Sequence, residues 1–140
     1  MASEFEYVRF RLGRKDTREE RFAALGKVLG ALRERKAREA SGQLDEDSAN
    51  TEAREMVRLV HSPAAIADLE TDLSLILACE YFIGDLVRLG SDLAEVRYDA
   101  QAWPYGGVTS LVRLVESFGF EIEQVDNGTD VLSAEDFRER

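Results

Sequence analysis

The expected fold follows mainly from residues 93–126, which have the sequence LAEVRYDAQAWPYGGVTSLVRLVESFGFEIEQVD. Apolar and charged residues alternate over 93–99, which is the period-two pattern of a strand. An apolar stripe at helical spacing follows over 108–118, and a second strand pattern follows over 120–126. A strand, a helix and a strand in this order predict a right-handed β-α-β crossover that joins parallel strands.

Two further strands are predicted outside this unit. Residues 4–12 alternate in the same way, with Val8 and Phe10 on one face of the predicted strand. The turn sequence at 126–128 favours a short return strand over 129–132. The sheet is therefore expected to have three or four strands.

Helices are expected to supply most of the mass. A capping box starts a helix over 17–38, and weaker patterns predict helices over 51–60 and 63–89. The stretch 73–89 is the most apolar part of the chain, and its apolar residues occupy an arc of about 180° on a helical projection. We expect it to form the central helix.

These elements predict a single α+β domain in which a mixed sheet packs against several helices. The chain has 140 residues, of which 44% are apolar and 33% are charged, as is typical of one globular domain. Residues 41–50 (SGQLDEDSAN) are expected to form a mobile acidic loop, and residues 134–140 a frayed tail.

The charge of the chain is large and unevenly distributed. The formal net charge is −10, yet residues 1–40 hold 11 Lys and Arg against 7 Asp and Glu. A surface with this much negative charge repels phosphate backbones. We therefore expect no nucleic-acid partner, and a basic protein is favoured as the partner. The basic N-terminal helix either lies against the acidic remainder or serves solubility, and an RNA-binding role for its basic end at 33–38 is the weaker alternative.

Compartment and membrane association follow from what the sequence lacks. Cys79 is the only cysteine, so no disulfide can form within the chain, and no secretion signal precedes the first strand. The longest apolar stretch falls short of the roughly 20 residues that a membrane span needs. A cytoplasmic protein without a membrane partner is expected.

The most specific local feature is the aromatic and glycine sequence at 103–107. Trp103 and Tyr105 either cover the end of the core or form exposed anchors for a protein partner. Gly106 and Gly107 precede a predicted helix, so their backbone N–H groups offer a site for a small anion or nucleotide as a further alternative.

The sequence offers few parts for catalysis. His61 is the sole histidine and is expected to sit at a helix end, Cys79 lies within the apolar arc, and Glu80 at its edge favours a pair with an arginine. Asp45, Glu46 and Asp47 are consecutive, which is not the alternating spacing of a calcium loop. We therefore expect no enzyme, no metal and no cofactor.

The function that these patterns favour is an acidic protein-binding module of the immunity or inhibitor kind, which neutralises a basic toxin or nuclease. The alternative is a small-ligand or anion sensor that uses Gly106 and Gly107. No oligomeric state is indicated. The residues expected to bind the partner combine carboxylates with aromatic anchors: Asp45, Glu46, Asp47, Asp99, Trp103 and Tyr105.

Overall fold

A computed structural model describes most of the chain. It covers residues 6–13, 15–40, 42–59, 66–79, 81–100, 108–126 and 131–139. The elements follow in the order β1 (Glu6–Arg11), α1 (Arg18–Lys36), α2 (Glu46–Leu59), α3 (Ile66–Ala78), β2 (Tyr81–Arg88), β3 (Leu93–Ala100), α4 (Val108–Ser117), β4 (Glu121–Asp126), β5 (Val131–Ser133) and α5 (Ala134–Glu139).

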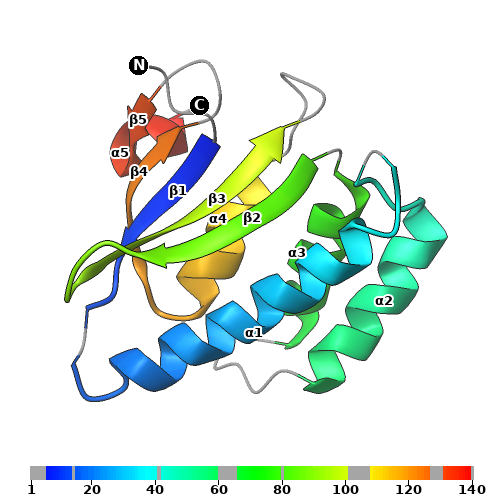
Figure 1. Cartoon of the computed structure of the whole chain (residues 1–140), viewed down its shortest axis with the longest axis horizontal. Helices are drawn as coiled ribbons and strands as arrows, with labels where there is room; N and C mark the ends of the chain where they lie inside the picture. Colours follow the sequence, from blue (N-terminus) through cyan, green and yellow to red (C-terminus); the bar gives the residue numbers. More distant parts are fainter. Residues whose placement is uncertain are drawn as a thin grey trace.

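The described strands form one open sheet in the order β2-β3-β1-β4-β5, and every pairing in it is antiparallel (Figure 1). The predicted α+β class is confirmed, but the prediction of a mixed sheet with three or four strands is wrong. β3 and β4 run in the same direction, as the crossover predicts, yet they are not neighbours. The central strand β1 lies between them and pairs with both, which places the N-terminal strand in the middle of the sheet.

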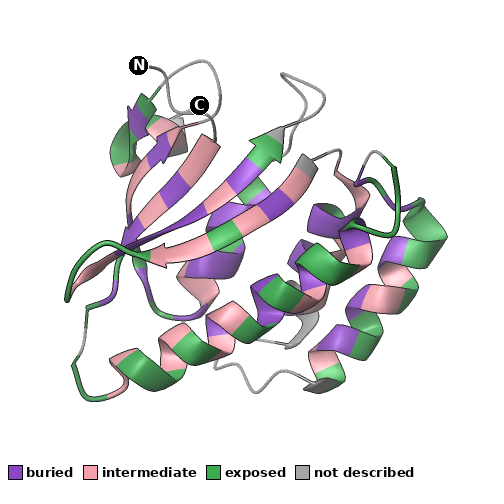
Figure 2. Cartoon of the chain, in the orientation of Figure 1, coloured by how far each residue is buried: buried purple, intermediate pink, exposed green. Residues whose placement is uncertain are grey.

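The large helices lie in layers against the sheet (Figure 1). α1 contacts β2, α4 contacts β4 and β1, and α3 packs against both α1 and α4. α2 packs on α3 and lies away from the strands. Figure 2 shows that the exposed residues of α1 and α2 alternate with buried ones along each helix, as expected for helices with one covered side.

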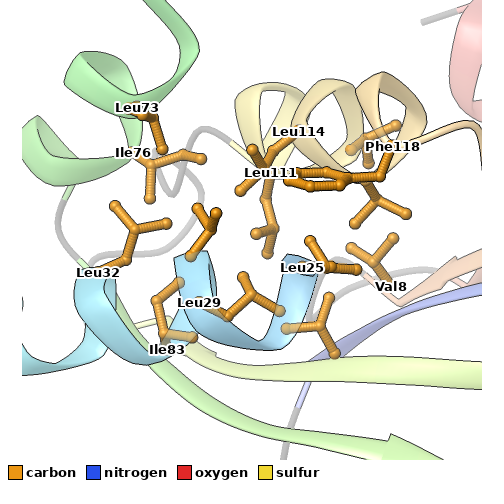
Figure 3. Close-up of a cluster of buried hydrophobic side chains, with 14 of the residues drawn as sticks. Val8, Leu25, Leu29, Leu32, Leu73, Ile76, Ile83, Leu111, Leu114 and Phe118 are labelled. Carbon is orange, nitrogen blue, oxygen red and sulfur yellow. The ribbon is translucent and has the colours of Figure 1, made fainter. Parts of the chain in front are cut away.

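The hydrophobic core lies where α1, α3 and α4 meet the sheet (Figure 3). Val8 and Phe10 of β1 are fully buried, so the alternation in this strand points its apolar side chains to the helices. The side chains that Figure 3 labels come from all of these elements: Val8, Leu25, Leu29, Leu32, Leu73, Ile76, Ile83, Leu111, Leu114 and Phe118.

The predicted central helix over 73–89 is wrong in its second half, because α3 ends at Ala78 and residues 81–88 form β2. A β-bulge explains the error. Ile83 pairs with Tyr98 and Leu86 pairs with Val96, with a register shift between the two pairs. Both partners are core residues of β3, so the extra residue places Ile83 and Leu86 on one face at a spacing of three. That spacing is the one typical of a helix.

Two segments expected to be mobile or frayed hold helices, and the terminal turn of helix that the sequence predicts from Ser133 and Asp136 is present. Residues 46–50 of the predicted acidic loop form the start of α2, and residues 134–139 of the predicted tail form α5. The Ser133 hydroxyl accepts a hydrogen bond from the Asp136 backbone N–H at 3.2 Å, which is the cap that starts α5.

A buried lysine joins α1 to the end of α3. Lys36 is fully buried, and its Nζ donates hydrogen bonds to the carbonyl oxygens of Ile76 at 2.8 Å and Cys79 at 2.6 Å. These carbonyls belong to the C-terminal turn of α3, where a helix leaves acceptors unpaired and favours a cation. Burial lowers the pKa of Lys36 to about 8, and the nearby Cys79 opposes that shift.

We expect Lys36→Met to destabilise the protein by about 1 to 3 kcal/mol, because it leaves two buried carbonyls without their donor. The stability lost should grow as the pH rises from about 8 towards 10.5. In that window the folded lysine is neutral and still donates, whereas the unfolded lysine holds its proton, so stability rises with pH.

Urea denaturation of the parent and the variant across this pH range tests the prediction. Both proteins should carry Cys79→Ala, because burial raises the pKa of the Cys79 thiol and this acts on stability in the opposite sense. A difference in stability that stays constant with pH would contradict the assignment.

Candidate functional site

Several elements begin or end at the same end of the molecule (Figure 1). The end of α1 reaches the end of α3 through Lys36. The Leu44 backbone N–H donates to the Leu77 carbonyl at 3.0 Å, which places the start of α2 beside the end of α3. Asp99, near the end of β3, pairs in register with Phe82 at the start of β2. The predicted carboxylates at 45–47 and at 99 therefore lie towards one end of the fold.

Asp45 is the N-terminal cap of α2. Its carboxylate accepts hydrogen bonds from the Ser48 backbone N–H at 2.8 Å and from the Ser48 hydroxyl at 3.0 Å. The Ser48 N–H is the main cause that holds the pKa of Asp45 below its usual value. Both carboxylate oxygens of Asp45 therefore accept hydrogen bonds within the protein, and their role is structural.

Glu46 and Asp47 occupy the first turn of α2 and are exposed. Among the described residues, no ion pair holds either carboxylate. They differ from Asp45, whose carboxylate is engaged by Ser48, because their charges remain available to a partner.

Glu46 also lines a groove of about 580 Å³ between α2 and α3. Most of the remaining wall comes from α3, and the lining combines carboxylates, a polar pair and apolar side chains: Glu46, Asn50, Glu70, Ser74, Leu75 and Ala78. Leu75 is 45% exposed, which is unusual for a leucine in this protein and supplies an apolar surface within the groove.

Two polar contacts join α2 and α3 along this groove. The Ser74 hydroxyl donates to Asn50 Oδ1 at 2.5 Å, and Arg54 Nε lies 3.3 Å from Glu70 Oε1. The side chain of Arg54 is 65% exposed and that of Glu70 is 38% exposed. An ion pair this accessible to water contributes little to stability, so a competing cation can replace Arg54.

The basic residues of α1 are largely engaged within the protein. Arg18 pairs with Asp92 at 3.2 Å, Arg33 with Asp85 at 3.4 Å, and a further pair joins α1 to α2 through Arg35 and Glu52 at 2.7 Å. These contacts fit the interpretation in which the basic helix lies against acidic parts of the chain.

Residues 42–79, in contrast, hold eight Asp and Glu against two Arg. The segment that holds α2 and α3 therefore has a formal net charge of −6.

A second polar cluster lies on the face of the sheet opposite the core. Glu95 is only 5% exposed, and its carboxylate accepts hydrogen bonds from Arg9 at 3.0 and 3.2 Å and from Arg97 at 2.9 Å. The Tyr7 hydroxyl donates to Gln124 Oε1 at 2.6 Å, and the Arg9 guanidinium lies over the Tyr7 ring. The cluster ties β1, β3 and β4 together across the sheet.

The sequence patterns do not predict this cluster. The alternation in 4–12 separates Arg9 from Val8 and Phe10, but the register that places Arg9 opposite Glu95 is a property of the folded sheet. Since both guanidinium groups satisfy the same carboxylate, the arrangement fits a structural ion cluster better than an acid or a base.

The binding roles predicted for the aromatic and glycine sequence at 103–107 remain predictions. Trp103, Tyr105, Gly106 and Gly107 lie outside the described residues. α4 begins at Val108, so a helix does follow the two glycines as the sequence predicts.

Of the residues considered for catalysis, the structure describes only Cys79. His61 and Glu80 lie outside the residues that the structure covers, and burial raises the pKa of the half-buried Cys79 thiol. Within the described ranges, no group of three or more His, Cys, Asp or Glu side chains is placed to hold a metal ion. None of the described helices is long and apolar enough to cross a membrane.

Comparison of this chain with protein-family models, with curated proteins and with solved structures finds no significant match.

We expect Asp45→Ala to lower the melting temperature by a few degrees, because α2 loses its N-terminal cap. Asp45→Asn should keep most of the stability, since asparagine caps helices about as well as aspartate. The advantage of the parent over Asp45→Asn should fade as the pH falls below 3.8, because the unfolded carboxyl then takes up a proton and the folded one, with its lowered pKa, does so only at a lower pH. Melting curves by circular dichroism measure all three, and an Asp45→Ala variant as stable as the parent would show that the cap is dispensable.

Proposed function

We propose that this protein is a non-enzymatic, acidic binding module that neutralises a basic protein, most concretely a toxin or nuclease, by direct contact. The observation that carries the proposal is the contrast between α1 and the pair α2 and α3. Cations of α1 are used in ion pairs within the chain, whereas Glu46 and Asp47 of α2 stand exposed beside a groove.

This contrast supports a basic partner for an electrostatic reason. A concentrated patch of one sign steers an oppositely charged protein and raises the association rate by roughly 10-fold to 1,000-fold. An inhibitor that must reach its target quickly gains from such steering. A patch that serves only solubility would give no stoichiometric complex, and this difference makes the two explanations separable.

The partner should be captured on the immobilised full chain from a lysate of the native cell and eluted over a salt gradient. We expect one basic protein, retained at close to one copy per chain and released as salt shortens the screening length from about 10 Å at 0.1 M to about 3 Å at 1 M. The purified partner should then lose its activity when the chain is added. A captured protein whose activity is unchanged would argue against neutralisation.

Charge-matched variants test where the partner binds. The triple variant Asp45→Asn, Glu46→Gln and Asp47→Asn should weaken binding by about tenfold or more, because it removes the carboxylates beside the groove. The control Asp16→Asn, Glu20→Gln and Glu121→Gln changes the net charge equally at exposed positions near the start of α1 and of β4. If both triple variants weaken binding equally, the effect comes from net charge alone, and the segment 45–47 is not the binding site.

Trp103 offers an independent test of the aromatic anchors. Trp103→Ala should weaken binding by about thirtyfold, which is about 2 kcal/mol and the size expected of an interface hot spot. Isothermal titration of the purified partner with the variant measures the change. Unchanged affinity would remove Trp103 from the interface.

A further inference from the structure

We propose that the groove between α2 and α3 binds an arginine side chain of the partner, next to an apolar side chain of the same segment. This inference rests on the proposed function and names the chemistry that the groove recognises. It starts from the composition of the groove wall, in which carboxylates and an exposed leucine lie together.

The wall matches the two parts of an arginine side chain. Leu75 and Ala78 offer an apolar surface for the aliphatic stem, which long basic side chains bury while their charged end stays in water. Glu70 offers a carboxylate for the head, and Glu46 offers another at the opposite end of the groove. The planar guanidinium favours arginine over lysine, because it can donate two parallel hydrogen bonds to one carboxylate.

Arg54 is an internal competitor for this site. Its Nε lies 3.3 Å from Glu70 Oε1, so the protein already places one of its own guanidinium groups on a carboxylate of the groove. Because this pair is exposed, it exchanges at little cost with an arginine from outside. Glu46 has no ion pair among the described residues and offers a second carboxylate two turns of α2 before Arg54, at the other end of the groove.

The size of the groove fits more than one side chain. Its volume of about 580 Å³ falls within the range of about 300 to 1,000 Å³ that binding pockets span. We therefore assign the groove to a short segment that pairs an arginine with a neighbouring leucine-like side chain. A neutral apolar segment would cover Glu46 without supplying it a counter-charge.

Substitutions of the two members of the Arg54–Glu70 ion pair should change the affinity in opposite directions. Glu70→Gln should weaken binding, whereas Arg54→Gln should strengthen it two- to threefold because it frees the Glu70 carboxylate. Arg58→Gln is the matched control. It makes the same change in net charge on the same helix, at an exposed residue outside the groove lining.

The probe is the peptide acetyl-Leu-Arg-Ala-Arg-Leu-amide, with a second peptide that carries neutral citrulline in place of both arginines. Each is titrated into the full-length, nitrogen-15-labelled chain, and binding is followed by amide shifts in two-dimensional NMR. We expect shifts in residues 46–50 and 70–78 with the arginine peptide, and a loss of about tenfold in affinity for the double variant Glu46→Gln and Glu70→Gln. Leu75→Ser should weaken binding as well, and because Leu75 is exposed this variant should keep the fold.

Three results with the peptides would overturn the proposal: equal shifts with the citrulline peptide, shifts spread over the whole acidic surface, or equal effects of Arg54→Gln and Arg58→Gln. Failure of the proposed function can be distinguished from failure of the groove assignment. If the captured basic protein binds the double variant as tightly as the parent, the groove assignment is wrong while the binding function stands. If the arginine peptide binds in the groove but no basic protein is neutralised, the function is wrong while the groove assignment stands.

Discussion

The arrangement of this end of the molecule depends on the buried ammonium of Lys36. Its hydrogen bonds to the Ile76 and Cys79 carbonyls close the last turn of α3 and bring the end of α1 against it. The chain then leaves α3 directly for the edge strand β2, while the Leu44 hydrogen bond to Leu77 starts α2 at the same place. Burial of a charge is costly unless its donors are satisfied, so this contact restricts how α1, α2 and α3 can be arranged. The position of the groove between α2 and α3 follows from that restriction.

The distribution of charge follows from the same arrangement. Once α1 is fixed between the sheet and α3, its arginines reach Asp85 of β2, Asp92 in the turn between β2 and β3, and Glu52 of α2. Arg33 also donates to the Gly84 carbonyl on the edge strand β2, next to the bulge. A bulge and a charged side chain on an edge strand both discourage pairing with another sheet. The basic helix thus stabilises and protects the fold, whereas Glu46 and Asp47 at the start of α2 stay exposed.

Local patterns in the sequence predicted much of the fold and little of the site. Period-two and helical spacings located β1, β3, α4 and β4 because each of these segments has one buried face. β2 was missed because its bulge places Ile83 and Leu86 at a helical spacing on the core side. The Glu95 cluster depends on strand register, and the groove depends on which faces of α2 and α3 meet. Neither is encoded in one local stretch, so a single sequence could indicate the carboxylates but not their neighbours.

Adjacent carboxylates in the segment 45–47 illustrate why that distinction matters for function. Asp45 directs both of its oxygens to Ser48 and so fixes where α2 begins. That starting point places Glu46 on the side of α2 that faces α3, one turn before Asn50 and two turns before Arg54, in the row that meets Ser74 and Glu70. The cap therefore determines which carboxylate enters the groove, although it does not line the groove itself. A partner that reads the acidic segment by charge alone would respond equally to all three residues, whereas a partner that inserts an arginine would depend on Glu46 by contact and on Asp45 through the position of the helix.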